Sequence, residues 1–383
     1  MKTINTILMG AFLLAGTVFG VSGGVQAPRI PAKGFAMSSP ESEFKQIDFT
    51  RRAVGNSDVE IEILYSGICH SDIHTARGDW GPVPYPAILG HEICGKVVAV
   101  GKNVTKFKAG DFAGVGCLVG SCGVCEDCRE GQEQYCRRGP VGTYANKDYN
   151  HGNEITMGGY SNKIVVPERF ALKIPAGADL KRVAPLLCAG VTTYSPIRAF
   201  GVKAGQKAGV AGFGGLGHMA VQYLVRLGAE VTVFDITESK RADAARLGAK
   251  RYVNVTRPGE LKGLDNSFDF ILSTIPASYE PIMYMKMLKR KGELCIVGLP
   301  AVAEAPVLKT TDLVFSAPDR FLKGWQIGGL PETQEMLDYS VKNNIYPEVE
   351  LIPATGEAVT QAWRDVVAGK VKFRYVIDMQ TLK

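Results

Sequence analysis

Residues 208–228 read AGVAGFGGLGHMAVQYLVRLG and decide the fold of the second half of the chain. A short apolar run leads into G-x-G-G-x-G at 212–217. Apolar residues then recur at helical spacing until Gly228, which is typical of a helix C-cap. A strand, a glycine turn and a helix in this order are typical of a dinucleotide-binding βαβ unit. Apolar runs and helical patterns keep alternating up to residue 297, which predicts an α/β fold with a doubly wound parallel sheet.

The glycines of this turn have separate tasks. Gly212 permits the tight turn, Gly214 lets backbone N–H groups approach a pyrophosphate, and Gly217 allows the helix to pack closely on the strand. The helix N-terminus adds partial positive charge for the phosphates. The alternative interpretation is a glycine-rich turn without a ligand. Four further residues are assigned to the same cofactor site: Gly215, Leu216, Thr192 and Lys240.

The next apolar run, at 231–234, ends in Asp235. A carboxylate at the tip of the second strand can accept hydrogen bonds from both hydroxyls of the adenosine ribose. It would repel a 2′-phosphate, because two like charges at ~4 Å in a partly dry site cost several kcal/mol. Asp235 therefore favours NAD over NADP, and an ordinary solvated aspartate is the alternative.

The first part of the chain, from residue 30 to about 180, is rich in short strand patterns and glycine turns. Apolar and acidic residues alternate over 59–63, which predicts a half-buried strand. After the parallel-sheet region, the chain ends with a helical pattern and short strand patterns. We therefore divide the chain into segments 28–184, 185–325 and 326–383, and we expect the last segment to return to the first domain.

Residues 1–27 have the pattern of a secretory signal peptide or N-terminal anchor. Lys2 precedes a nearly unbroken apolar run at 7–21, and small residues follow up to Ala27. The run is short for a membrane span, which needs ~20 residues. The pattern predicts export to the periplasm, with membrane contact only through this segment. An uncleaved extension of a cytoplasmic protein is the alternative.

Composition and charge exclude several classes of protein. The 383 residues suffice for two or three domains, and 46% hydrophobic with 21% charged residues is ordinary globular usage. The chain is therefore not disordered or fibrous. The net charge of +6 is spread without a basic run, so we expect no nucleic-acid partner.

Four of the nine cysteines lie within fifteen residues, at Cys122, Cys125, Cys128 and Cys136. Two C-x2-C steps followed by a fourth thiol suit a tetrahedral zinc ion held by four thiolates. We expect this site to be structural, because it would hold together a lobe, about 117–140, with little apolar content. A pair of disulfides or an iron–sulfur cluster are the alternatives.

A second group of metal-binding residue types is dispersed along the chain, at Cys69, His91 and Cys188. Two thiolates and one imidazole, with an open fourth position, are what a catalytic zinc requires. Spacing alone does not bring them together, and Cys188 by itself would more often be a buried core thiol. The three remaining cysteines lie in apolar runs and are predicted to be core residues: Cys94, Cys117 and Cys295.

Five segments together resemble the zinc-dependent medium-chain alcohol dehydrogenases, in particular the cinnamyl alcohol dehydrogenase-like, broad-range aldehyde reductase branch. They are GICHSDIH (67–74), GHEICGKVVAVG (90–101), the four-cysteine cluster, PLLCAGVTTYSP (185–196) and GFGGLGHMAVQY (212–223). The resemblance extends from about residue 30 to 379. It implies a GroES-like β-barrel catalytic domain and a Rossmann domain with a cleft between them.

The resemblance also implies roles for individual residues. Cys69, His91 and Cys188 match the catalytic zinc ligands, and Glu92 matches an acid that can enter the zinc shell when no substrate is bound. The four clustered cysteines match the structural zinc site. The remaining matches surround the substrate: Ser71 and His74 as proton relay, Asp72 as the residue that orients a zinc-side group, His70 near the cofactor phosphates, and Trp80 in the substrate pocket.

The implied activity is the interconversion of primary alcohols and aromatic or aliphatic aldehydes by hydride transfer, with two zinc ions per subunit and a homodimer. Members of this branch usually carry Ser, Thr or Arg at the position of Asp235 and use NADP(H), so Asp235 favours NAD(H) against the habit of the family. Three alternatives remain: a zinc-independent quinone reductase, a polyol dehydrogenase, and a non-catalytic nucleotide- and zinc-binding redox sensor.

Overall fold

Strand β3 (Asp58–Gly67) lies at the centre of the first sheet in the computed structural model, which describes residues 28–383. Val59, Ile61 and Ile63 are buried and Glu62 is exposed, so the predicted strand is confirmed. The signal peptide or anchor predicted for residues 1–27 lies outside the described residues, and export stays a prediction. In residues 28–383 we find no helix with the length and hydropathy that a membrane span requires.

The first sheet is mixed and mostly antiparallel. Its strand order is β12-β6-β5-β3-β20-β19, and β11 also pairs with β3. The remaining strands of this sheet are β5 (Ile93–Val100), β6 (Phe112–Val115), β11 (Lys163–Pro167), β12 (Leu172–Lys173), β19 (Val349–Pro353) and β20 (Arg374–Asp378). A smaller sheet, in the order β2-β1-β4, consists of β1 (Ile30–Met37), β2 (Lys45–Arg51) and β4 (Ala87–Ile88). Two short ladders are formed by β7 (Leu118–Gly120) with β8 (Val141–Gly142), and by β9 (Lys147–Asp148) with β10 (Glu154–Ile155).

The second sheet has six parallel strands in the order β15-β14-β13-β16-β17-β18. This order reverses direction at β13, as a doubly wound Rossmann sheet requires. Its strands are β13 (Lys207–Ala211), β14 (Glu230–Asp235), β15 (Arg251–Asn254), β16 (Phe268–Ser273), β17 (Leu288–Ile296) and β18 (Phe321–Gly324). Strand β17 begins at Leu288, six residues before the apolar run at 294–297. The sequence pattern misses this first half because three exposed basic residues, at 289–291, interrupt the apolar residues.

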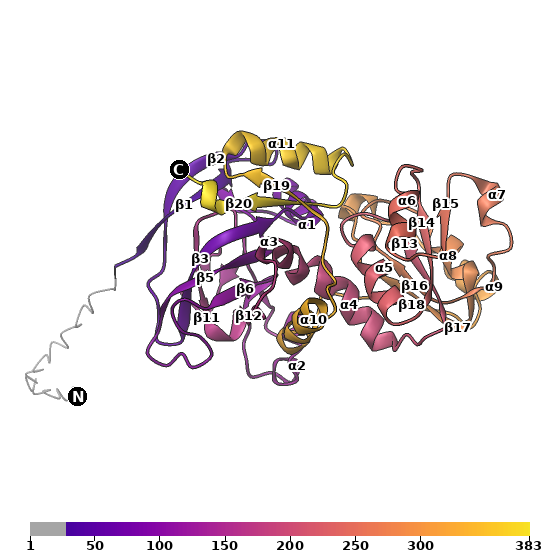
Figure 1. Ribbon diagram of the computed structural model, residues 1–383, viewed down its shortest axis with the longest axis horizontal. Coiled ribbons are helices and arrows are strands. Elements are labelled where there is room, and N and C mark those ends of the chain that lie inside the picture. The colour runs from indigo at the N-terminus through magenta and orange to yellow at the C-terminus, as the bar shows by residue number, and fades with distance from the viewer. Residues whose placement is uncertain (1–27) are drawn as a thin grey trace, which may run out of the picture.

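The helices cover these sheets and connect them. In Figure 1 the first sheet occupies the left lobe, the parallel sheet occupies the right lobe, and α4 and α10 lie between them. The predicted helices in the second half of the chain are confirmed as α5, α6 and α10. The helices are α1 (His70–Arg77), α2 (Glu126–Arg129), α3 (Leu180–Val183), α4 (Ala189–Phe200), α5 (Gly217–Arg226), α6 (Arg241–Arg246), α7 (Pro258–Leu261), α8 (Pro281–Met287), α9 (Thr310–Phe315), α10 (Leu330–Lys342) and α11 (Gly356–Val367).

The last segment of the chain joins the first sheet. Strand β20 pairs with β3 in antiparallel fashion and with β19 in parallel, so residues far apart in sequence share one sheet. One buried cluster fills the first domain, and a second extends from the parallel sheet through α4 to α10. The two lobes therefore share packed side chains at their junction.

Candidate active site

Cys69 lies where the central strand of the first sheet turns into helix α1. It is the N-cap of α1, and its backbone N–H donates to Oδ2 of Asp72 at 3.0 Å. This capping bond anchors the first turn of the helix. Since only Ile68 separates the cysteine from the end of β3, its thiol lies at a strand–helix junction.

Cys69, His91, Glu92 and Cys188, which we call the dispersed site, lie together although they come from three separate segments. One ligand atom from each residue lies within 4.8 Å of the others, and all four residues are buried. The sulfurs of Cys69 and Cys188 are 3.9 Å apart. His91 and Glu92 immediately precede β5, and Cys188 is the N-cap of α4. The fold thus brings together the residues that sequence spacing left apart.

The ring of His91 has a fixed orientation. Its Nδ1 bonds to Oδ1 of Asp72 at 2.9 Å, and Tyr160 donates its hydroxyl to Oδ2 of the same carboxylate at 2.8 Å. Asp72 is fully buried. Since a carboxylate only accepts, Nδ1 carries the proton and Nε2 keeps its lone pair for a metal ion. Asp72 therefore supports both the cysteine and the histidine of the dispersed site.

The two thiols of the dispersed site are electrostatically unequal. The hydrogen bond from Cys188, aided by the charge of Arg374, holds the pKa of Cys69 well below its usual range despite burial. Hydrogen bonds with Cys117 and Cys69, together with burial, raise the pKa of Cys188. A thiolate is the metal-binding form, so Cys69 is the thiol of this pair closer to that form.

Cys117 is a functional candidate that sequence reasoning missed. It was predicted to be a core residue, but it is half-buried, and the neighbouring thiol of Cys188 lowers its pKa. The approach is possible because Gly116 packs against the backbone oxygen of Leu187, where a Cβ atom would lie only 2.9 Å away. The two cysteines lie in segments far apart along the chain, so no local sequence pattern predicts that they meet.

The proposed relay residues follow Cys69 on helix α1. Ser71 Oγ lies 3.6 Å from the sulfur of Cys69. Nδ1 of His74 bonds to Oδ2 of Asp79 at 2.8 Å, while its buried Nε2 has no hydrogen-bond partner within residues 28–383. Asp79 is a second residue that sequence reasoning missed, although it lies only five positions after the histidine. His70 begins the helix, with its ring 5.8 Å from that of His74.

Trp80 lies between the two lobes. Its ring stacks on His74 with centroids 5.0 Å apart, and its Nε1 donates to the backbone oxygen of Pro300 at 3.0 Å. Val302 donates its backbone N–H to the backbone oxygen of Asp79. The loop after α1 is therefore tied to a loop of the Rossmann domain, beside the dispersed site.

Glu92 has an unexpected partner. It is fully buried and forms an ion pair with Arg374, the first residue of β20. Sequence reasoning missed this arginine, although a charge at the start of the apolar run RYVI is unusual and could have drawn attention to it. The ion pair joins the last segment of the chain to the dispersed site.

The glycine turn has the shape that a dinucleotide needs. Gly212 has a φ of +87°, which favours glycine, and a Cβ on Gly217 would lie 2.0 Å from the backbone oxygen of Gly212. Gly214 faces open space, and Leu216 is the N-cap of α5. The roles proposed for the three glycines thus agree with their surroundings.

Asp235 ends β14 beside this turn, but its carboxylate already has partners. Oδ2 accepts from the backbone N–H of Phe213 at 2.7 Å, and Oδ1 accepts from the N–H and hydroxyl of Thr237, both at 2.9 Å. Lys240 Nζ donates to the backbone oxygen of Phe213 at 3.3 Å. Each carboxylate oxygen has two acceptor positions, so the group keeps capacity for a ribose hydroxyl. The buried hydroxyl of Thr192, another predicted cofactor contact, has no hydrogen-bond partner in the described part of the chain.

Cys122, Cys125, Cys128 and Cys136, which we call the cysteine lobe, form the second candidate metal site. Their sulfurs lie within 4.8 Å of one another, and those of Cys122 and Cys128 are 3.9 Å apart. Backbone N–H groups point at the sulfurs, as from Cys125 to Cys122 at 3.4 Å. These donors lower the pKa of Cys122. The four sulfurs remain free thiols, so the alternative of two disulfides is not what the structure has.

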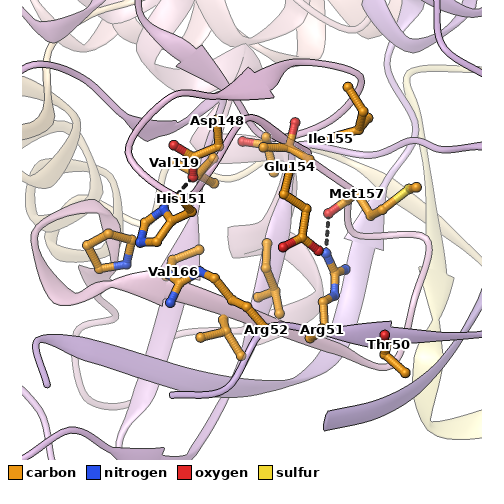
Figure 2. A pocket seen from close by; sticks show the side chains of 15 residues that line it. Thr50, Arg51, Arg52, Val119, Asp148, His151, Glu154, Ile155, Met157 and Val166 are labelled. Atoms are coloured by element: carbon orange, nitrogen blue, oxygen red, sulfur yellow. Dashed lines mark hydrogen bonds and ion pairs between the residues drawn. The ribbon is translucent and has the colours of Figure 1, made fainter. Parts of the chain in front are cut away.

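A separate cavity lies at the far end of β2, near the β9–β10 ladder (Figure 2). Arg51 and Arg52 line it, and Figure 2 shows Arg51 directed at the backbone oxygen of Met157. Every charged lining side chain is paired within the chain: Arg51 with backbone oxygens, Arg52 with Asp58, His151 with Asp148, and Glu154 with Arg29. These groups hold loops together and leave no charge for a ligand.

The donor sets fit the groups that the sequence implies. Two thiols, an imidazole and an optional carboxylate suit a catalytic zinc, and four thiols suit a structural one. For a dinucleotide, the turn offers the open Gly214, and Arg374 adds a buried Nε that has no hydrogen-bond acceptor among the described residues.

Comparisons with known proteins agree with this geometry. Residues 55–176 match the alcohol dehydrogenase GroES-like domain, and residues 215–341 match the zinc-binding dehydrogenase family. The chain is 44% identical over 350 residues to NADP-dependent alcohol dehydrogenase C 1 of Mycolicibacterium smegmatis, covering 91% of this chain and 98% of that protein. It is 43% identical to aldehyde reductase YahK of Escherichia coli, covering 91% and 99%.

A solved structure supports the same assignment. The chain aligns with CAD from Helicobacter pylori, solved in complex with NADP(H), with a TM-score of 0.88 and 50% identity over 92% of this chain and 99% of that one. The chain belongs to the zinc-type medium-chain alcohol dehydrogenase family. The resemblance inferred from the motifs and the predicted GroES-like and Rossmann folds are thereby confirmed.

Proposed function

We propose that this chain interconverts primary alcohols and aldehydes by hydride transfer with a nicotinamide dinucleotide. The convergence of Cys69, His91 and Cys188 beside the glycine turn carries the proposal, since this set can hold a zinc ion with an open position. The relatives named alcohol dehydrogenase C 1 and aldehyde reductase YahK support the same reaction class. When bound, zinc supplies a Lewis acid for the substrate oxygen, and the nicotinamide gives or takes the hydride.

Side chains of helix α1 handle the proton. Ser71, whose hydroxyl contacts the sulfur of Cys69, is the first protein group to receive the proton of an alcohol. Asp79 holds the proton of His74 on Nδ1, so the lone pair of the buried Nε2 is free to accept the proton that Ser71 passes on. Asp72 keeps the imidazole of His91 in the tautomer that binds metal.

The substrate pocket is proposed to lie under Trp80. The indole is fixed by its bond to Pro300 and by stacking on His74, so it offers a rigid aromatic wall between the lobes. Aromatic aldehydes should therefore be reduced with a lower KM than short aliphatic ones. Trp80→Ala should raise the KM for cinnamaldehyde more than that for propanal, and equal increases would contradict the placement.

The cofactor preference is proposed to depend on Asp235. Relatives are named for NADP, but the Asp235 carboxylate would lie beside the 2′-phosphate of that cofactor. Repulsion of several kcal/mol in a partly dry site corresponds to at least about tenfold. We expect a higher kcat/KM with NADH than with NADPH, and Asp235→Ser should reverse the order. A preference of the unmodified chain for NADPH would overturn this assignment.

One assay separates the proposed activity from its rivals. The zinc-loaded full chain is incubated with NADH and a panel of benzaldehyde, cinnamaldehyde, a ketose and a quinone. Oxidation of NADH with the aldehydes supports the proposal. Turnover of the ketose alone would indicate a polyol dehydrogenase, turnover of the quinone a quinone reductase, and no turnover a non-catalytic binding protein.

The cysteine lobe is proposed to hold a second, structural zinc ion, so the chain would bind two per subunit. Four thiolates leave no open position for a substrate. Its sulfurs, two half-exposed and two buried, also lack the carboxylate and imidazole that belong to the dispersed site. Metal analysis of the purified chain should give two zinc ions per subunit.

A homodimer is proposed on the edge of the parallel sheet. Among the strands of residues 28–383, β18 pairs only with β17, and all four of its residues are exposed. Large apolar side chains are exposed on the strand and on the preceding helix α9, among them Phe321 with 55% and Phe315 with 82% exposure. An open, apolar edge strand is a surface for pairing with another chain. Light scattering should give twice the subunit mass, and Phe321→Lys should lower it to one.

A further inference from the structure

A cavity outside both metal sites lies between α4, α5 and α10, and its volume is about 140 Å³. Each helix contributes one tyrosine to its wall: Tyr194 from α4, Tyr223 from α5 and Tyr339 from α10. Their ring centroids are 5.3 to 6.5 Å apart, so the three rings contact one another. They form a continuous aromatic surface, which we call the tyrosine wall.

Hydrogen bonds hold the tyrosine wall in place. Tyr194 donates its hydroxyl to Oε1 of Glu335 at 2.7 Å, and the hydroxyl of Tyr223 bonds to Oγ of Ser340 at 2.8 Å. Burial and the nearby carboxylate raise the pKa of Tyr194, so its phenol stays neutral and the negative charge belongs to Glu335. Tyr194 and Tyr223 are also buried. The wall therefore offers ring surfaces that are already fixed before a ligand binds.

The surroundings of this cavity favour positive charge. The face of an aromatic ring is electrically negative, and Glu335 adds a full negative charge beside it. A cation of the chain already lies there: the guanidinium of Arg198 is 5.9 Å from the centroid of Tyr194 and 3.2 Å from Oε1 of Glu335. The Arg198 and Glu335 side chains are 53% and 52% exposed, and an ion pair in water stabilises a fold little. A cation from solution can therefore displace Arg198 at small cost.

We propose that the tyrosine wall and Glu335 bind a small methylated ammonium ion in place of the Arg198 guanidinium. Aromatic rings attract such ions by the cation–π interaction, which is how proteins recognise quaternary ammonium groups. A cavity of roughly 150 Å³ accepts one benzene-sized molecule, so a single trimethylammonium or tetramethylammonium group fits here. An anion is disfavoured by Glu335, and Mg²⁺ is disfavoured because one carboxylate is a poor set of oxygen ligands.

This site is separate from the proposed reaction. Its lining residues belong to neither metal site nor to the glycine turn. Because α4 and α5 lie in segment 185–325 and α10 lies in segment 326–383, a bound ion would contact both segments at once. Binding should therefore raise the Tm of the chain.

Titration of the zinc-loaded full chain with tetramethylammonium chloride tests the proposal. Ligand-observed NMR gives the Kd, and sodium chloride keeps the ionic strength constant. We expect saturable binding in the millimolar range or tighter. Arg198→Gln should lower the Kd by about threefold, because the competing cation is lost. Glu335→Gln and Tyr339→Leu should each raise the Kd by about fivefold or more, because each removes an attraction for the cation.

The signs of these changes separate the proposal from a purely structural ion pair. If Arg198 and Glu335 only stabilised the fold, neither substitution would tighten the binding of a cation. Tyr346→Leu is the matched control, because Tyr346 lies under the guanidinium of Arg182, at 4.8 Å, but does not line the cavity. It should leave the Kd for tetramethylammonium unchanged. Urea unfolding confirms that each variant is folded.

A neutral probe of similar shape shows whether charge decides the binding. tert-Butanol is nearly as large as tetramethylammonium, and as a tertiary alcohol it has no hydrogen on its carbinol carbon to give as hydride. We expect no binding of tert-butanol that depends on Tyr339. Equal affinity for the two probes, or an unchanged Kd in both Glu335→Gln and Tyr339→Leu, would overturn the proposal. Absence of tetramethylammonium binding in Arg198→Gln would overturn it as well.

Discussion

The dispersed site and the cysteine lobe use the same atoms in contrasting surroundings. The lobe takes four sulfurs from one fifteen-residue stretch, and two of its cysteines are half-exposed. The dispersed site takes two sulfurs, an imidazole and a carboxylate from three segments, all of them buried. Backbone N–H groups support the lobe, whereas charged side chains support the dispersed site. With metal bound, we expect the first arrangement to be closed and the second to keep an exchangeable position, which is the difference between a structural and a catalytic metal site.

The two sites also differ in the parts of the fold to which they are attached. Glu133 of the lobe segment accepts from the N–H of Leu330 at 2.9 Å, and Arg169 donates to the backbone oxygen of Cys128. The lobe is thus fastened to the start of α10. The dispersed site is fastened instead to the glycine turn, through Arg374. Loss of the lobe should affect folding, and loss of the dispersed site should affect chemistry.

The largest expected effect is on activity, from Cys69→Ala. Removing one thiolate should lower kcat/KM for benzaldehyde by about 10³ or more, because the metal contributes several kcal/mol to the transition state. Cys295→Ala, which removes another fully buried thiol, serves as the matched control and should stay active. Similar activity of Cys69→Ala and Cys295→Ala would contradict the catalytic role of the dispersed site.

The next effect is on stability, from Cys125→Ala. We expect the free energy of unfolding in urea to fall by several kcal/mol, because metal binding contributes to folding. The kcat per folded molecule should stay within about twofold, since the lobe touches no reacting group. A variant with unchanged stability and lost activity would mean that the lobe is catalytic.

The smallest of the three effects is on metal affinity, from Asp72→Asn. The amide keeps the shape but loses the charge that holds His91, so zinc affinity of the dispersed site should fall by about 10- to 100-fold. Asp148→Asn is the control, because Asp148 holds Nδ1 of His151 in the same way at 2.6 Å outside both metal sites. Chelator competition measures both variants, and equal affinities would contradict the orienting role of Asp72.

The same contrast explains how much the sequence alone could predict. The lobe and the glycine turn are local, so the spacing of Cys122 to Cys136 and the order of strand, turn and helix predicted both. The dispersed site depends on how β3, β5 and α4 meet, and only the family resemblance brought its residues together. Arg374 was missed because its partners lie 282 and 159 residues earlier, at Glu92 and Gly215.

Cys117 and Asp235 show two further reasons why sequence prediction stops short. Cys117 lies in an apolar run typical of a core strand, and only the packing of Gly116 on Leu187 turns it toward Cys188. Asp235 was correctly placed at the end of its strand, but its bonds to Phe213 and Thr237 depend on the path of two loops. The sequence predicts the helices and strands here, but the contacts between side chains of distant segments are found only in the three-dimensional structure.

The central claim, that the buried metal site does the chemistry, is tested most directly by graded removal of metal from the unmodified chain. Bound zinc and benzaldehyde-dependent oxidation of NADH are measured on the same samples during chelation and after zinc is returned. We predict that oxidation falls to background as zinc leaves the dispersed site and recovers when zinc is added. Full oxidation by a chain that holds no zinc would contradict the account.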